Sequence, residues 1–169
     1  LFIFASSIFY LNTMSGSPYT FAHFFFFSAL VITMFTDATT LLISRMVTLY
    51  AMPIGWILSN ASLIALNPFE SILGSVTGLL LLTLIRTVSR KVMGKDGLGQ
   101  GDIDLLCFIG AFTGPIGCWI TLMTGSIIGS IIGLCYVIAD RGNTTVMLPF
   151  GLFLGMGASL YVLFQNQLS

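Results

Sequence analysis

Charged side chains are scarce in this sequence. Of its 169 residues, six are Lys or Arg, six are Asp or Glu and one is His, whereas 56% are hydrophobic. Soluble domains usually carry roughly 25% charged residues, so charge cannot cover the surface of this chain. The composition therefore predicts an integral membrane protein with lipid as its surroundings. The formal net charge is zero, which gives no basic field for nucleic acid, and we expect no nucleic-acid partner.

Cysteine pairs at metal-binding spacing are also missing. Cys107, Cys118 and Cys135 lie far apart in apolar segments. We expect each to be a small buried hydrophobe, and we expect no metal site. The sequence begins at Leu1 and not at Met, so a fragment of a longer protein is one interpretation that it allows.

Apolar runs fill most of the chain. A helix needs about 20 apolar residues to cross a bilayer, so these runs predict membrane-spanning helices. We expect an all-α integral membrane protein, a polytopic bundle of about six to seven transmembrane helices forming one domain over residues 1–169, with no separate soluble domain. The runs cover residues 1–11, 21–35, 41–59, 72–85, 103–113, 119–139 and 148–164.

A basic segment sets the expected orientation. Four of the six cations lie in a predicted loop over residues 86–102, namely Arg86, Arg90, Lys91 and Lys95. Cytoplasmic loops carry an excess of Lys and Arg, so we expect this loop in the cytoplasm. Counting crossings outward from it predicts that Asp37 and Asp102 lie at the same, cytoplasmic membrane face.

These two aspartates are the candidate functional residues. Asp102 ends the stretch Gly99-Gln100-Gly101-Asp102 and opens an apolar run, and Asp37 ends another. An ionisable residue within an apolar segment is costly and marks a functional-site candidate. The other interpretations are structural: Asp102 could stabilise a helix N-terminus, and Asp37 could cap the helix that follows it. Asp104 could also share the site.

Two neighbouring carboxylates can catalyse hydrolysis together. Such a pair shares one proton, so one acid takes a proton from water while the other protonates the substrate carbonyl. This chemistry needs no metal. We therefore predict Asp37 and Asp102 as catalytic residues and Gly99, Gln100 and Gly101 as a substrate-binding loop, because glycine lets an extended peptide approach closely. The run 103–113 reaches only roughly 16 Å, which predicts a recessed, watery cleft.

Glycine spacing suggests where helices pack. Gly74 and Gly78 lie four residues apart, and Gly125, Gly129 and Gly133 repeat the same interval. Small residues at this spacing permit close helix contact in membranes. In so glycine-rich a chain the spacing could equally be incidental.

The motifs together resemble a known family. Gly99-Gln100-Gly101-Asp102 matches the GxGD signature of intramembrane aspartyl proteases. The later Leu148-Pro149-Phe150-Gly151 is similar to the Pro-Phe-Gly sequence that opens a late helix in the bacterial prepilin peptidases, the type IV leader peptidases. The resemblance implies Asp37 and Asp102 as the catalytic pair and type IV prepilins or pseudopilins as substrates. It also implies a multi-pass protein of the bacterial inner membrane that removes a basic leader peptide on the cytoplasmic side.

The resemblance leaves methylation open. Many family members also methylate the new N-terminus with S-adenosylmethionine, and that cofactor is expected here only if the chain methylates. Cleavage itself needs no cofactor, and we can assign no residue to S-adenosylmethionine.

The chain departs from the family pattern in three places. Ile43-Ser44 stands where Leu-Pro or Ile-Pro is usual, Asp104 stands where Lys is common, and the two CxxC pairs of the long form are missing. Presenilin-type relatives pair GxGD with Tyr-Asp and Pro-Ala-Leu, which differ from the residues here. Two other functions stay open: a transporter or channel subunit using membrane-embedded Asp residues, and a catalytically silent assembly protein.

Overall fold

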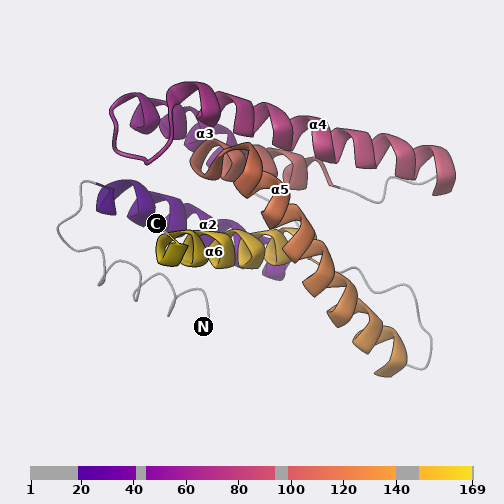
Figure 1. Ribbon diagram of the computed structural model, residues 1–169. Coiled ribbons are helices and arrows are strands. Elements are labelled where there is room, and N and C mark those ends of the chain that lie inside the picture. The colour runs from indigo at the N-terminus through magenta and orange to yellow at the C-terminus, as the bar shows by residue number, and fades with distance from the viewer. Residues whose placement is uncertain (1–18, 41–44, 94–98, 140–148, 169) are drawn as a thin grey trace.

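The computed structural model describes residues 19–40, 45–93, 99–139 and 149–168, and within these ranges the chain forms helices and no strands. Three helices are long and apolar enough to cross a membrane, Thr20–Thr40, Pro68–Val92 and Gln100–Ala139. The all-α class is therefore confirmed, whereas six to seven spans are not, and the run 1–11 lies outside the described residues. The helices are α2 (Thr20–Thr40), α3 (Arg45–Asn60), α4 (Pro68–Met93), α5 (Gln100–Ala139) and α6 (Phe150–Leu168) (Figure 1).

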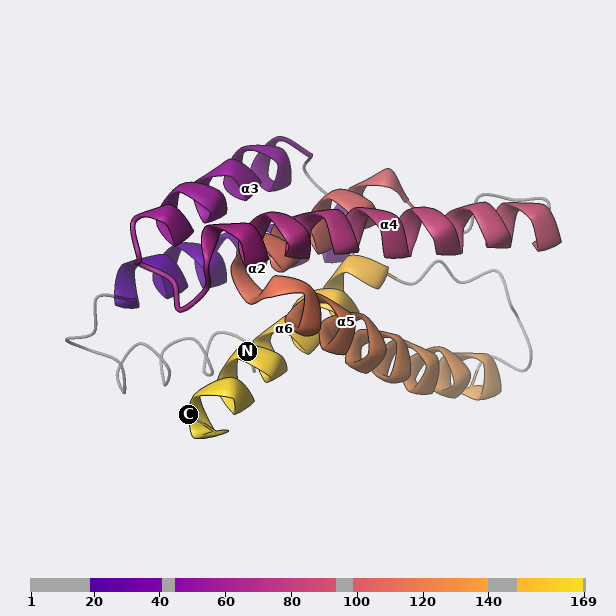
Figure 2. The same cartoon turned by 45° about the horizontal axis from the view of Figure 1, so that its top comes forward.

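Helix α5 is two helical segments joined at a sharp bend. Gly114 has φ 73° and ψ −177°, and Pro115 follows it. This backbone conformation is essentially restricted to glycine, and proline cannot donate a hydrogen bond to continue the helix. Figures 1 and 2 show the chain reversing direction there. The apolar runs 103–113 and 119–139 thus lie in two helical segments that meet at this bend.

The first segment of α5 packs closely against α4 through glycines. A β-carbon on Gly74 would collide with the carbonyl oxygen of Gly110, and one on Gly78 would lie 2.7 Å from that of Leu106. Contacts this short are possible only without a side chain. The four-residue spacing of Gly74 and Gly78 is therefore a packing feature and not incidental.

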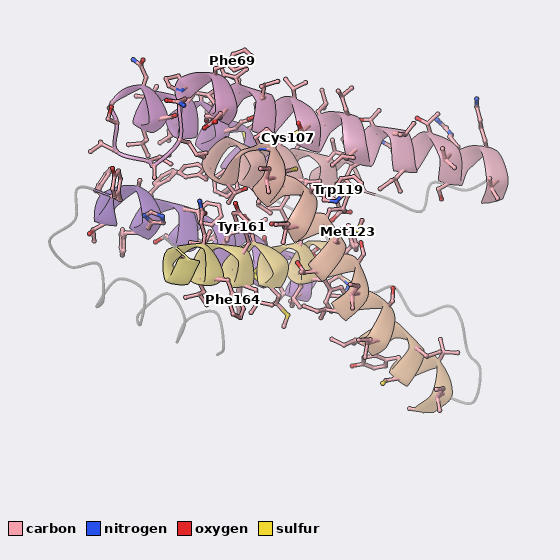
Figure 3. The ribbon with its side chains drawn as sticks, viewed as in Figure 1. Phe69, Cys107, Trp119, Met123, Tyr161 and Phe164 are labelled. Atoms are coloured by element: carbon pink, nitrogen blue, oxygen red, sulfur yellow. The ribbon has the colours of Figure 1, made fainter. Side chains whose placement is uncertain are left out.

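The second segment of α5 packs against α6 in the same way. A β-carbon on Gly125 would lie 2.9 Å from the carbonyl oxygen of Phe153, and one on Gly129 would lie 3.0 Å from the Phe153 ring. In Figure 3 Tyr161 projects from α6 towards α5, where its ring lies 2.6 Å from the position of a β-carbon on Gly117. Gly125 and Gly129 thus allow α6 to pack closely against the second segment of α5.

An aromatic cluster ties α2 to the first segment of α5. The ring centroids of Phe26 and Phe108 lie 5.4 Å apart, and those of Phe108 and Phe112 lie 5.1 Å apart. Phe26 and Phe108 are fully buried. Since buried aromatic pairs contribute roughly 0.5–1.5 kcal/mol beyond their area, this cluster fixes the position of α2 relative to α5.

Two sequence-based expectations are wrong. The predicted loop over residues 86–102 is much shorter, because α4 continues to Met93 and α5 begins at Gln100. Arg90 and Lys91 in the last turn of α4 interact favourably with the helix dipole and so help the helix to continue.

The other error concerns Cys135, which is exposed although Cys107 and Cys118 are buried as expected. Cys135 lies on the part of α5 that projects beyond the other helices (Figure 1). Other apolar side chains on the outside of the bundle include the labelled Phe69, Trp119 and Phe164 (Figure 3). Such side chains suit a surface that faces lipid.

Candidate active site

Asp37 lies in the last turn of α2 and points towards α6. Its side chain is 4% exposed, and its Oδ2 accepts a hydrogen bond of 3.1 Å from the backbone N–H of Leu152. The Gly151 amide also donates to this carboxylate. Asp37 therefore binds the N-terminal turn of a helix more than a hundred residues away. This contact is not the one expected if Asp37 served to cap the segment directly after it.

Asp102 lies in the first turn of α5. It is 8% exposed, and its Oδ2 accepts a hydrogen bond of 3.2 Å from the backbone N–H of Gly99. A side chain at the third helical position that reaches back to the residue preceding the helix is the acidic half of a capping box. This contact starts the helix at Gln100, so Gln100 and Gly101 are helical and not parts of a loop as predicted.

The structure brings the two aspartates together. The two carboxyl groups lie near enough for the Asp37 charge to act on Asp102. Both side chains are buried, and each accepts a backbone N–H through Oδ2. A buried pair of carboxyl groups that interact with each other is the arrangement that shares one proton. The two predicted acids therefore lie near each other, and their catalytic role stays a prediction.

Asp104 does not belong to this pair. It lies two residues beyond Asp102 on the same helix, and residues at that spacing do not face the same direction. Its charge acts on Cys107, further along α5. Of the three acids that the sequence indicates for the site, Asp37 and Asp102 are the two whose carboxyl groups interact.

The start of α5, which carries Asp102, lies short of the ends of the neighbouring helical segments. From Gly114 the first segment of α5, residues 100–113, rises roughly 21 Å, whereas the second, residues 115–139, rises roughly 38 Å. Figures 1 and 2 show α4 and the second segment extending well past the start of α5. The predicted recessed, watery cleft stays a prediction. Both carboxyl groups are buried, whereas Gly99 and Gln100 at the start of α5 are exposed.

A small cavity lies at the opposite end of α2. Its lining is mostly apolar and includes one histidine, His23, about 21 Å along the helix from Asp37. It does not fit a methyl donor that must act on the same peptide end as the aspartates. The lining residues are Ala22, His23, Phe26, Ile64, Phe112, Val162 and Gln165.

Sequence reasoning missed the contribution of α6 to the site. The Pro149-Phe150-Gly151 sequence was noticed as a motif, but a backbone amide carries no residue-specific signal. Only the folded chain reveals that the amides of Gly151 and Leu152 reach Asp37.

Several characterised proteins are similar to this chain. The prepilin leader peptidase/N-methyltransferase of Pseudomonas putida is 28% identical over 99 residues, covering 59% of this chain and 34% of the relative. The enzyme of the same name from Aeromonas salmonicida strain A449 is 26% identical over 100 residues, covering 59% and 34%. The type 4 prepilin-like proteins leader peptide-processing enzyme of Escherichia coli O78:H11 is 34% identical over 96 residues, covering 55% and 34%.

The aligned part spans about a third of the length of these relatives. No solved structure matches the chain significantly. The family model described as the type IV leader peptidase family matches residues 24–138, a range that contains Asp37, Asp102 and the close contact between α4 and α5. By that match the chain belongs to the type IV leader peptidase family.

Proposed function

We propose that this chain is an intramembrane aspartic endopeptidase that removes the leader peptide of type IV prepilins or pseudopilins. The observation that carries the proposal is the electrostatic interaction between two buried acids, Asp37 and Asp102, in a member of this family. The names of the relatives describe them as prepilin leader peptidases, which supports the substrate class.

In the proposed reaction one carboxylate accepts a proton from a water molecule, which attacks the scissile carbonyl carbon. The other carboxyl group donates its proton to the carbonyl oxygen, and a tetrahedral intermediate forms. The carboxyl group that took the proton from water then gives it to the leaving amine, while the other carboxylate recovers a proton from a hydroxyl of the intermediate. The C–N bond breaks, two peptides are released and the acid pair returns to its starting state. Asp37 and Asp102 exchange all of these protons, and exposed Gly99 and Gln100 are the adjacent surface on which the peptide backbone would lie.

We further propose a multi-pass protein of the bacterial inner membrane with the pair open to the cytoplasm. Arg86, Arg90 and Lys91 lie towards the C-terminal end of α4, the end that extends past the start of α5 (Figure 2). Cationic residues at one end of a span favour the cytoplasmic side. A substrate whose basic leader stays in the cytoplasm would then reach the pair from the same side.

Methylation is a separate activity. The names of the relatives include N-methyltransferase, and S-adenosylmethionine would be the methyl donor. The small cavity at the other end of α2 does not fit S-adenosylmethionine acting beside the aspartates, so no residue is assigned to methyl transfer. Cleavage is proposed to proceed without a cofactor.

Co-expression with a candidate prepilin tests the proposal. We expect the wild-type chain to remove the leader, and we expect Asp37→Asn and Asp102→Asn each to reduce cleavage at least a hundredfold while inserting normally. Mass spectrometry of the product N-terminus scores leader removal and methylation separately. Asp104→Asn is the matched control, because Asp104 lies outside the pair, and it should cleave as the wild type does.

The same experiment separates the other candidate functions. A transporter or channel subunit with intramembrane acids would lose ion movement in the Asp37 and Asp102 variants without any leader cleavage in the wild type. An assembly protein would show neither effect. Leader removal by the wild-type chain that persists in both Asn variants would contradict the proposed chemistry.

A further inference from the structure

The packing of α2 against α6 has a fixed register. Asp37 meets the Leu152 amide, and one turn away on each helix Met34 meets Gly155. The helices are therefore antiparallel, and a step of three residues down one matches a step of three up the other.

Gly155 sets how close the two helices lie. A β-carbon there would collide with Met34 Sδ and would lie 2.6 Å from Met34 Cγ. Contacts shorter than 3.0 Å require something to move, and a thioether chain that is 6% exposed has little room to do so. Without a side chain at position 155, α6 can lie against α2 where its first turn reaches Asp37.

The first turn of α6 offers amides that have no partner within their own helix. The first four N–H groups of any helix lack an intrahelical acceptor, and together they carry partial positive charge. In α6 two of these groups, from Gly151 and Leu152, donate to Asp37. The Leu152 amide holds the carboxylate by Oδ2, and together the two amides restrict the orientation of the group.

We propose that the first turn of α6 is a positioning element for the Asp37 carboxylate: the amides of Gly151 and Leu152 orient it towards Asp102, and Gly155 sets the helix separation at which they reach it. Asp102 is oriented differently, by the Gly99 amide at the start of its own helix. Each acid thus accepts a backbone N–H through its Oδ2. This inference rests on the proposed peptidase function and names Gly155, Gly151 and Leu152 as positioning residues, not catalytic ones.

Gly155→Ala and Leu152→Pro test the proposal with a purified enzyme and a prepilin substrate. The first substitution separates the helices, and the second removes the donated N–H at a position where a first-turn proline breaks no intrahelical bond. A misplacement of about 1 Å can slow catalysis roughly a hundredfold. We expect kcat to fall about tenfold or more in each variant, with KM within about twofold of the wild type.

Gly157→Ala is the matched control. Gly157 lies on α6 too, but a β-carbon there would meet α5, 2.6 Å from Thr124 Oγ1 and 2.7 Å from the Thr121 carbonyl oxygen. It therefore disturbs the packing of α6 against α5 without touching the α2 contact. Gly157→Ala should lower the apparent Tm, but its kcat should fall clearly less than that of Gly155→Ala. Met34→Ala combined with Gly155→Ala restores space and should return kcat to the level of Met34→Ala alone. Equal loss in both glycine variants, or no rescue by Met34→Ala, would overturn the inference.

A thermal double-mutant cycle decides the question even if no substrate is cleaved. Asp37→Ala and Leu152→Pro remove opposite halves of one contact, so their combined shift in apparent Tm should be smaller than the sum of the single shifts. Asp37→Ala with Gly157→Ala should be additive. Additive shifts in the first pair would reject the positioning contact, whereas absence of cleavage by the wild-type chain would reject only the proposed function.

Discussion

The substitution Gly78→Ala is predicted to damage both stability and cleavage, although it lies outside the acid pair. A β-carbon at this position would lie 2.7 Å from the Leu106 carbonyl oxygen, 2.8 Å from the Leu106 carbonyl carbon and 3.0 Å from the Cys107 nitrogen. All three contacts are with backbone, which cannot rotate away as a side chain can. The helices must therefore separate by about half an ångström or more to restore ordinary contact distances.

The size of the effect follows from that separation. Overpacking of this kind costs about 1–3 kcal/mol, which corresponds to a fall in Tm of roughly 2–12 °C for a chain of this size. Leu106 lies one helical turn from Asp102, so the displacement moves the acid directly. Since about 1 Å of misplacement can cost roughly a hundredfold, we expect cleavage to fall between about threefold and tenfold.

The assay is apparent Tm in detergent together with prepilin cleavage by the same preparation. Leu80→Ala is the control on the same helix, because Leu80 is 63% exposed and its truncation leaves the contact with α5 intact. It should change neither quantity appreciably. If Gly78→Ala kept the Tm and the cleavage rate of the wild type, this backbone contact would not hold α4 against α5, and the reasoning would fail.

Three further results are expected. Gly114→Ala should cost about 1–3 kcal/mol, because φ 73° and ψ −177° suit glycine alone, and a Tm unchanged from the wild type would argue against the sharp bend in α5. Maleimide in detergent should label exposed Cys135 quickly and buried Cys107 and Cys118 only on unfolding, and equal rates at all three would contradict the packing described. The indole N–H of Trp56 donates to Ser75 Oγ at 3.0 Å, so Trp56→Phe should destabilise the α3–α4 contact by about 1 kcal/mol, the usual value of one hydrogen bond. Ser75→Ala should lower Tm by a similar amount. If neither variant changed Tm, this hydrogen bond would not stabilise the fold.

Much of the helical architecture could be predicted from the sequence because it depends on local composition. Apolar runs long enough to span a bilayer identify helices with little ambiguity, and the Gly114-Pro115 pair predicts the reversal in α5. The spacing of Gly74 and Gly78 indicated a close contact, though not its partner. That partner, around Leu106 and Gly110, depends on how α4 and α5 align, which no local pattern specifies.

The ends of helices were predicted less well. Basic residues suggested a loop from residue 86, yet α4 continues through Arg90 and Lys91 to Met93, because cations are compatible with the C-terminal turn of a helix. Exposure of Cys135 could not be predicted either. An apolar residue facing lipid has the same sequence signature as one facing the core, so the interior must be known first.

The candidate site could be predicted in part. Asp37 and Asp102 were singled out because charge is rare in apolar segments, and the structure brings them together. The role of the α6 amides could not be predicted, because every residue except proline carries the same N–H. Their importance depends on register and distance, and both are properties of the folded chain.

The most direct test of the central claim is a cycle of cleavage rates for Asp37→Asn, Asp102→Asn and the double variant, measured with one purified prepilin. If the two acids act as a single unit, either substitution alone removes nearly all activity and the second adds little. We predict the same residual rate, at least a hundredfold below wild type, in all three variants. Losses that multiply, or a single variant that keeps more than about a tenth of the wild-type rate, would contradict a shared catalytic pair.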